Sequence, residues 1–176
     1  MQERCKIGVV IGNANSPHAI NIMKGIDQAS KECDVQLMYF MNVSSPYTAQ
    51  LYPPDTSIGW DYQKSAIYDY ARYVKADVLI MTYGMMSIFM KSDYGKQYLE
   101  YFRNVPCVLI NEQTDRPNWT SIIVDNYNGM YELVEHLVRD HGYHNFAFLA
   151  GPPGNTDACQ RKRAFLDVMK KYDLPM

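Results

Sequence analysis

Apolar positions along this chain form short continuous runs that alternate with amphipathic stretches. Runs rich in β-branched residues are typical of strands buried on both faces, and six are expected, at 6–11, 35–40, 76–81, 108–110, 122–124 and 145–149. Apolar spacings of three and four residues predict helices from 17 onward and at 61–74, 93–103, 126–138 and 157–172. Strand and helix alternate, which predicts a Rossmann-like, doubly wound α/β fold with a parallel sheet.

One connection breaks this alternation. The segment 112–120, which contains Pro117, joins the fourth and fifth strands without a helical pattern. A parallel crossover without a helix indicates an edge strand or a passage into a second lobe. We therefore expect an N-terminal lobe over residues 1–124 and the start of an incomplete C-terminal lobe over 125–176. A second long loop, rich in Ser, Pro and Asp, is expected at 42–59.

Polar side chains follow several of the expected strands. In open parallel sheets, ligands bind beyond the carboxyl ends of the strands, where the loop after the first strand offers Asn13 and Asn15, and His18 follows at the start of the next helix. Such side chains can donate to and accept from hydroxyl groups. An equally open alternative is that the two asparagines only serve turn geometry. Further candidates follow the later strands: Tyr83, Asn111 and Asp125.

Motifs of catalysis and nucleotide binding are missing. The loop at 12–15 has one glycine, whereas the dinucleotide fingerprint and the P-loop need several glycines or a Gly-Lys-Ser/Thr ending. The loop at 151–155 has two prolines, which remove backbone donors that a phosphate would need. Ser16 and Ser87 lack a nucleophile-elbow context. We therefore expect no catalytic residues, no cofactor and no enzymatic activity in this chain.

The histidines and cysteines show no metal-binding spacing. His136, His141 and His144 do not form an H-E-x-x-H motif, and with Gly142 they are typical of a helix C-terminus. The four cysteines include no C-x-x-C pair; Cys33 and Cys107 are expected in the core. No metal site is expected.

Composition and charge limit the classes of function that are expected for this chain. The net charge of −2 gives no electrostatic reason to bind nucleic acid. Hydrophobic content of 47% is typical of a soluble globular protein. Neither a signal peptide nor a membrane span is evident, so we expect a cytoplasmic protein without a membrane partner.

Several motifs in fixed order resemble one family. They are Ile7-Gly-Val-Val-Ile, Asn15-Ser-Pro, Val108-Leu-Ile-Asn, Val124-Asp-Asn, Glu135-His-Leu, His141-Gly, Phe146-Ala-Phe-Leu-Ala-Gly-Pro and Arg161. Together they resemble the ligand-sensing domain of the lactose-repressor and ribose-binding-protein type, which has the periplasmic-binding-protein-like type I fold. The resemblance implies two Rossmann-like lobes joined by a hinge, with a small molecule bound between them, often a sugar or nucleobase.

The same resemblance implies a function and a site. The chain would be the sugar-sensing domain of a cytoplasmic bacterial transcriptional or signalling regulator, working as a homodimer on a small-molecule effector. It lacks the family's helix-turn-helix, so no direct DNA contact is expected; an output enzyme such as a diguanylate cyclase or histidine kinase would lie in a longer parent chain. Arg161 would reach into the cleft opposite Asn13 and Asn111, with Asp125 at the hinge. Alternatively, Arg161 only pairs with Asp157 at helical spacing.

Three other functions stay open. A solute-binding protein of a transport system would share the fold, although the missing signal sequence counts against it. A nucleotide-using Rossmann enzyme would need the glycine fingerprint or a catalytic dyad. A domain that keeps the fold only for dimerisation is not excluded, because a fold does not fix a function.

Overall fold

The computed structural model describes residues 4–43, 62–86, 92–151 and 155–175. Most of the predicted loop at 42–59, and Ser87, lie outside the described residues. The chain divides into two compact units, Met1–Ile123 and Val124–Met176. This division falls beside the boundary predicted at 124/125; the assignment of the units as the two lobes of a sensor stays a prediction.

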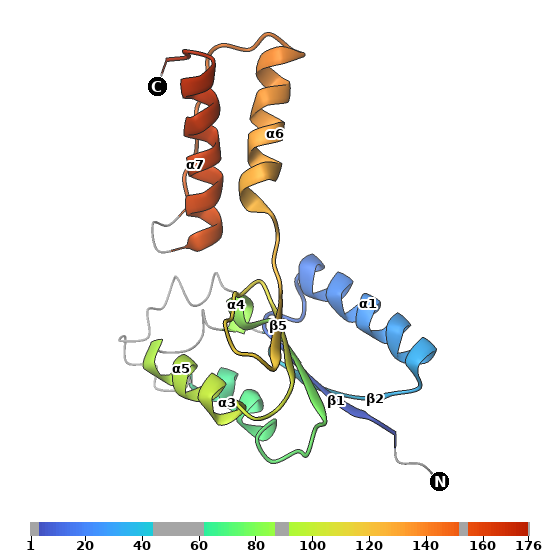
Figure 1. Cartoon of the computed structure of the whole chain (residues 1–176). Coiled ribbons are helices and arrows are strands. Elements are labelled where there is room, and N and C mark those ends of the chain that lie inside the picture. Colours follow the sequence, from blue (N-terminus) through green and yellow to red (C-terminus); the bar gives the residue numbers. More distant parts are fainter. Residues whose placement is uncertain (1–3, 44–61, 87–91, 152–154, 176) are drawn as a thin grey trace. The chain divides into compact units, whose positions relative to one another are not determined.

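The first unit is built on a five-stranded parallel sheet (Figure 1). Its strands follow the order β2-β1-β3-β4-β5, and all four neighbouring pairs are parallel. Their bounds are β1 Lys6–Ile11, β2 Gln36–Met41, β3 Val78–Met81, β4 Cys107–Ile110 and β5 Trp119–Ile122. The predicted doubly wound α/β fold is confirmed.

Alternating side chains of β1 face two different helical layers. Val9 and Ile11 pack with Ala19 of α1 (Pro17–Cys33) on one face. On the other face, the core that contains Val10 also includes residues of α3 (Tyr62–Tyr70) and α5 (Ser92–Tyr101). Both faces are covered, which suits the absence of polar side chains between Ile7 and Ile11, as expected for a parallel sheet.

The N-terminus of α1 follows the usual rules for helix capping. Ser16 is in the extended conformation, and its Oγ accepts a hydrogen bond of 3.1 Å from the backbone N–H of Ala19. Pro17 occupies the first turn, where no backbone donor is needed. This cap fixes where the helix begins and therefore where His18 lies.

The second unit contains two helices packed on each other, α6 (Asn126–Arg139) and α7 (Thr156–Lys171). Val134 and Val138 of α6 form a core with Phe165 and Val168 of α7. The segment 140–151 joins the helices, and Phe146 and Phe148 from it pack on this core. No described residue of this unit is part of a sheet.

Several expected elements were wrong. The sixth strand predicted at 145–149 is not a strand, because no other described segment offers its backbone a partner; its alternating phenylalanines instead contact Phe165. The fifth strand lies earlier than 122–124, since buried Trp119 is in register with Cys107. Residues 83–86, which lie outside the expected helices, form the short helix α4 (Tyr83–Met86). Cys33 is exposed at the end of α1, whereas Cys107 is buried as expected.

Candidate ligand-binding site at the carboxyl ends of the strands

The sheet order places a topological switch point between β1 and β3. The chain leaves β1 toward β2 on one side, and β3 pairs with β1 on the other. Ligands of open α/β sheets bind beyond the carboxyl ends of strands at such a point. The loop 12–16 and the segment 82–86 follow these two strand ends, so the candidate site is built from them and from the end of β4.

Backbone packing holds these two segments together. The backbone N–H of Gly12 donates a hydrogen bond of 3.0 Å to the buried Thr82 Oγ1. A Cβ added at Gly12 would lie 2.7 Å from the backbone of Met85 and 2.9 Å from the amide nitrogen of Met86. Only glycine permits this close approach, so the first loop and α4 form one rigid edge of the site.

Two of the predicted ligand residues contact each other at this edge. Asn111 Nδ2 and His18 Nε2 lie 3.1 Å apart, although 93 positions separate the residues in the sequence. Asn111 follows β4 with φ at 60°, a left-handed conformation that asparagine tolerates. A Cβ at Gly84 would lie 3.0 Å from the carbonyl oxygen of Asn111, so the end of β4 also packs against α4.

Tyr83 extends the same group of residues. A Cβ at Gly95 of α5 would lie 2.5 Å from the Tyr83 hydroxyl oxygen, so the phenol lies against a helix surface that only glycine leaves open. Burial raises the pKa of Tyr83, and the nearby carboxylate of Glu112 raises it further. The hydroxyl therefore stays protonated at neutral pH and can donate a hydrogen bond.

The two asparagines of the first loop have different roles in the fold. Asn13 has φ at 49°, and its carbonyl oxygen accepts a hydrogen bond of 2.9 Å from the N–H of Ser16. It thus does serve turn geometry, while its side chain is partly exposed at the strand end. Asn15 is exposed. The structure brings His18 and Asn111 into contact. Tyr83 lies on the adjoining helix α4 with its hydroxyl against Gly95, and Asn13 and Asn15 lie in the loop after β1.

The remaining two predicted residues belong to the second unit. Asp125 caps α6: its Oδ1 accepts from the N–H of Asn128 at 3.1 Å, and its Oδ2 accepts from Asn128 Nδ2 at 2.7 Å. These hydrogen bonds stabilise the charged carboxylate and hold the pKa of Asp125 below its usual value.

Arg161 is oriented by a partner that sequence reasoning missed. Its Nε donates a hydrogen bond of 2.9 Å to Oδ1 of Asn126, a buried residue of α6. Its contact with Asp157 is longer, at 3.8 Å. The ion pair at helical spacing therefore exists, but the shorter contact ties Arg161 to the first turn of α6. The two residues are 35 positions apart, so spacing alone gives no signal of the contact.

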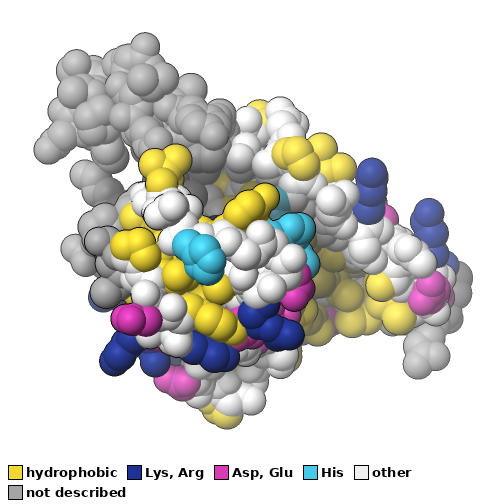
Figure 2. Space-filling model, turned by 90° about the horizontal axis from the view of Figure 1, so that it is seen from above, with side chains coloured by type: hydrophobic (Ala, Val, Ile, Leu, Met, Phe, Trp, Pro, Cys, Tyr) yellow, Lys and Arg dark blue, Asp and Glu magenta, His cyan; other side chains and the backbone are white. Residues whose placement is uncertain are grey.

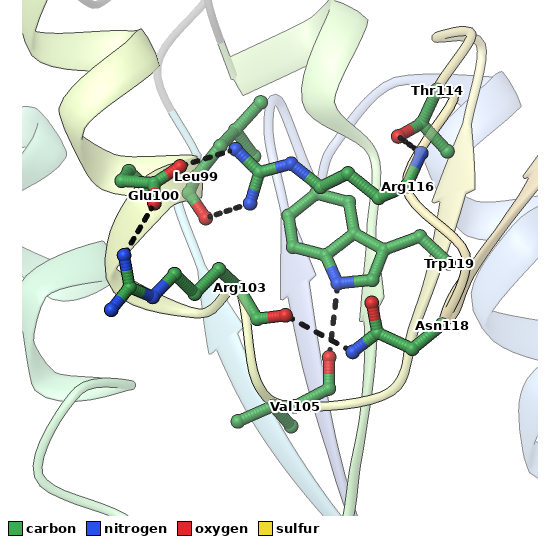
Figure 3. Close-up of polar contacts among 8 residues, drawn as sticks. All are labelled: Leu99, Glu100, Arg103, Val105, Thr114, Arg116, Asn118 and Trp119. Carbon is green, nitrogen blue, oxygen red and sulfur yellow. Dashed lines mark hydrogen bonds and ion pairs between the residues drawn. The ribbon is translucent and has the colours of Figure 1, made fainter.

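A surface hollow of about 470 Å³ lies away from this group of residues, at the amino ends of β4 and β5. Its lining includes Glu100, Arg103 and Arg116. Both arginines form ion pairs with the Glu100 carboxylate, Arg103 at 3.2 Å and Arg116 at 2.8 Å (Figure 3). Arg116 also donates to the Leu99 carbonyl at 3.1 Å and stacks on the ring of Trp119. These contacts hold the helix-free connection at 112–120 against α5. We therefore assign a structural role to the residues that line the hollow.

Comparison with known proteins finds partial similarity to transcriptional repressors. No family model matches the chain. It is 25% identical over 118 residues to a probable HTH-type transcriptional repressor, ExuR, of Bacillus subtilis; the match covers 61% of this chain and 35% of the relative. It is 28% identical over 93 residues to the HTH-type transcriptional repressor PurR of Photorhabdus laumondii, covering 51% and 27%. The matches thus span about a third of each curated relative.

Solved structures of transcriptional regulators align with this chain and share its fold. A lac repressor dimer bound to operator and the anti-inducer ONPF aligns over 99% of this chain and 54% of its own, with TM-score 0.68 and 18% identity. A putative ribose operon repressor from Burkholderia thailandensis aligns over 98% and 58%, with TM-score 0.67 and 16% identity. A LacI family regulator from Lactobacillus casei with bound sucrose aligns over 97% and 55%, with TM-score 0.61 and 16% identity.

The chain has the fold of a LacI-type ligand-binding domain. It covers about half of the length of these solved structures. The curated relatives are named as transcriptional repressors rather than enzymes. Among the residues that the structure describes, no helix is long and apolar enough to cross a membrane.

Proposed function

We propose that this chain is the small-molecule-sensing part of a transcriptional regulator and that its effector is sugar-like. The observation that carries the proposal is the His18–Asn111 contact at the carboxyl ends of the strands, on a LacI-type fold. Amide, imidazole and phenol groups can donate and accept hydrogen bonds, which suits them to the hydroxyl groups of a polyol. The sucrose-bound neighbour supports this chemical class.

The proposed contacts from the first unit are Asn13, Asn15, His18, Tyr83 and Asn111. Asp125 and Arg161 are proposed contacts from the second unit. Arginine suits this role because its five fixed donors can bridge two oxygen atoms at once. The hydrogen bond to Asn126 uses Nε and the longer ion pair with Asp157 uses Nη2, so a ligand would be bound by Nη1, or by Nη2 in place of Asp157. We also propose that the regulator works as a homodimer in the cytoplasm.

A thermal-shift screen of mono- and disaccharides, sugar acids and nucleosides tests the proposal on the intact chain. A compound bound only by the native state raises the melting temperature in proportion to RT ln(1 + [L]/Kd). Isothermal titration with each hit then gives its affinity. If no polyhydroxylated compound shifts the melting temperature while another class does, the sugar-like assignment is wrong.

Substitutions locate the site once a ligand is found. We expect Asn111→Ala and His18→Ala to weaken binding at least about tenfold, since each leaves a ligand hydroxyl without its partner at roughly 1–3 kcal/mol. Gln28→Ala, an exposed polar residue further along α1, is the matched control and should bind as the parent does. If all three variants bind the ligand with the same affinity, the carboxyl ends of these strands do not form the ligand site.

Arg161 receives a separate test because its role rests on the resemblance. Arg161→Ala should abolish ligand binding, whereas Arg163→Ala, two positions further along α7 and 78% exposed, should leave it intact. The lost Asn126 contact is expected to destabilise the unliganded chain by about 0.5–1.5 kcal/mol. Unchanged ligand affinity in Arg161→Ala would show that the residue only joins α7 to α6.

A further inference from the structure

The end of α6 carries two histidines that meet in space. Nε2 of His136 and Nε2 of His141 lie 3.1 Å apart, with the ring planes at 85°. They are five positions apart, which on a continuing helix would turn them to different faces. The pair therefore depends on how the chain leaves α6.

A glycine-based helix end brings His141 back to His136. Gly142 has φ at 65°, its N–H donates to the Val138 carbonyl at 3.1 Å, and the N–H of Tyr143 donates to the Leu137 carbonyl at 3.2 Å. The first is the 5→1 hydrogen bond of an αL C-cap, with Gly142 in the left-handed conformation. The Tyr143 ring stacks on His141 at 5.7 Å between centroids, which orients the second imidazole.

Asp140 fixes which nitrogen of His136 carries the proton. His136 Nδ1 lies 2.6 Å from Asp140 Oδ2, and a carboxylate only accepts, so Nδ1 is the donor. Nε2 of the neutral ring then offers a lone pair, which accepts the Nε2 proton of His141. A histidine that donates its other nitrogen to a carboxylate is the arrangement that orients metal ligands in proteins.

We propose that His136 and His141 form a two-imidazole chelate for a late first-row divalent metal ion such as Zn²⁺ or Ni²⁺. Zn–N bonds of about 2.0–2.1 Å in tetrahedral geometry put two ligand nitrogens roughly 3.3 Å apart, close to the observed 3.1 Å. On binding, His141 transfers its proton from Nε2 to Nδ1 through solvent, and each Nε2 then gives a lone pair to the metal. Water fills the remaining coordination positions.

The side chains are accessible to such an ion. His136 is 52% exposed and Asp140 55% exposed, and histidine side chains lie open at the surface in Figure 2. Imidazole suits Zn²⁺, Ni²⁺ and Cu²⁺ better than Mg²⁺ or Ca²⁺, which prefer oxygen. Among the described residues no group of three or more His, Cys, Asp or Glu could hold a metal, so the chelate is a two-ligand site that leaves room for exogenous ligands. This site is independent of the effector site proposed above.

Nuclear magnetic resonance of the intact, tag-free chain tests the chelate. Titration with paramagnetic Ni²⁺ should broaden the amide and imidazole signals of His136, His141 and their neighbours first. Zn²⁺ should shift the same imidazole nitrogens, and the Kd follows from the titration. Residues around the exposed Cys5, Cys33 and Cys159 report any competing thiol site separately.

Matched variants test whether His136 and His141 bind a metal ion or only belong to the end of the helix. We expect His136→Gln and His141→Gln each to weaken binding at least tenfold, and Asp140→Asn to weaken it by about 10–100-fold through loss of orientation. His144→Gln, an exposed histidine outside the pair, should leave the Kd unchanged. Saturating Zn²⁺ should raise the melting temperature of the parent but not of His141→Gln. The proposal is overturned if no broadening centres on 136–143 or if either single variant of the pair binds as the parent does.

Discussion

At the scale of single residues, glycines decide how closely the parts of the candidate site approach. Gly12, Gly84 and Gly95 each leave room where a Cβ would meet the backbone of α4, the end of β4 or the Tyr83 hydroxyl. The sequence shows these glycines but not what they face. Gly25, in contrast, lies in the exposed middle of α1 with nothing within 4 Å of an added Cβ.

Gly12→Ala should destabilise the chain by about 1–3 kcal/mol, because the added methyl group overpacks against backbone that cannot move aside. Gly25→Ala is the matched control and should stabilise it by about 0.5–1 kcal/mol through helix propensity. Urea unfolding followed by circular dichroism measures both. If Gly12→Ala and Gly25→Ala have equal stability, α4 moves aside at no cost in free energy. That result would contradict the rigid packing of the first loop against α4.

At the scale of elements, helix caps position the polar residues of both units. Ser16 begins α1, Asp125 begins α6 and Asn155 begins α7. At α7, Asn155 Oδ1 accepts a hydrogen bond of 2.8 Å from the N–H of Ala158.

Asn155→Ala should destabilise α7 by about 1 kcal/mol, the usual cost of losing a capping side chain. Thr156→Ala should have little effect, because Thr156 lies inside the helix and not at the cap. Hydrogen exchange at the amide of Ala158 reports the difference locally. Faster exchange in the Thr156 variant than in the Asn155 variant would contradict the assignment of the cap.

The cap at Asp125 should make α6 sensitive to acid. Hydrogen bonds from Asn128 lower the pKa of Asp125 in the folded chain. Its contribution to stability is therefore complete above the unfolded pKa of about 3.9 and is lost as the pH falls through the lower folded pKa.

Asp125→Asn keeps an accepting oxygen but no longer titrates. We expect the free energies of unfolding of the parent and variant to differ by a constant amount above about pH 5 and to converge or cross below about pH 4. Unfolding curves at a series of pH values measure this difference. A difference that stays constant through the acid range would mean that the carboxylate does not contribute through its charge.

At the scale of the whole molecule, apolar surface remains uncovered in both units. In the first unit, β5 is an edge strand, and Ile122 and Ile123 are 55% and 56% exposed. In the second unit, Leu149 is 97% exposed and Leu133 53%. Hydrophobic side chains also show on the face seen in Figure 2. Exposed edge strands and apolar side chains favour association between copies.

We therefore expect the chain to self-associate at tens of micromolar, roughly where weak interfaces populate. Analytical ultracentrifugation over a concentration series should show a mass above that of one chain, and Ile123→Lys should lower the association by adding a charge beside the edge strand. Lys75→Arg, an exposed substitution on the connection before β3, serves as the control. A single monomeric species at all concentrations would count against the homodimer.

The sequence by itself determined the fold of the first unit and the polar residues that follow its strands. Continuous apolar runs can only be buried between two helical layers, so strand number, parallel pairing and the polar strand ends followed from pattern. The order of the motifs also indicated the LacI-type fold. These features were predictable because each depends on residues close together in the chain.

Only the tertiary structure decided which distant residues touch. The contacts of His18 with Asn111 and of Arg161 with Asn126 join residues 93 and 35 positions apart, and no local pattern encodes them. The segment 145–149 has strand-like composition, yet pairing needs a neighbouring strand, and its phenylalanines pack on α7 instead. His136 and His141 meet because a left-handed glycine turns the chain back. Local periodicity sets what an element is, and packing between elements sets what its side chains can do.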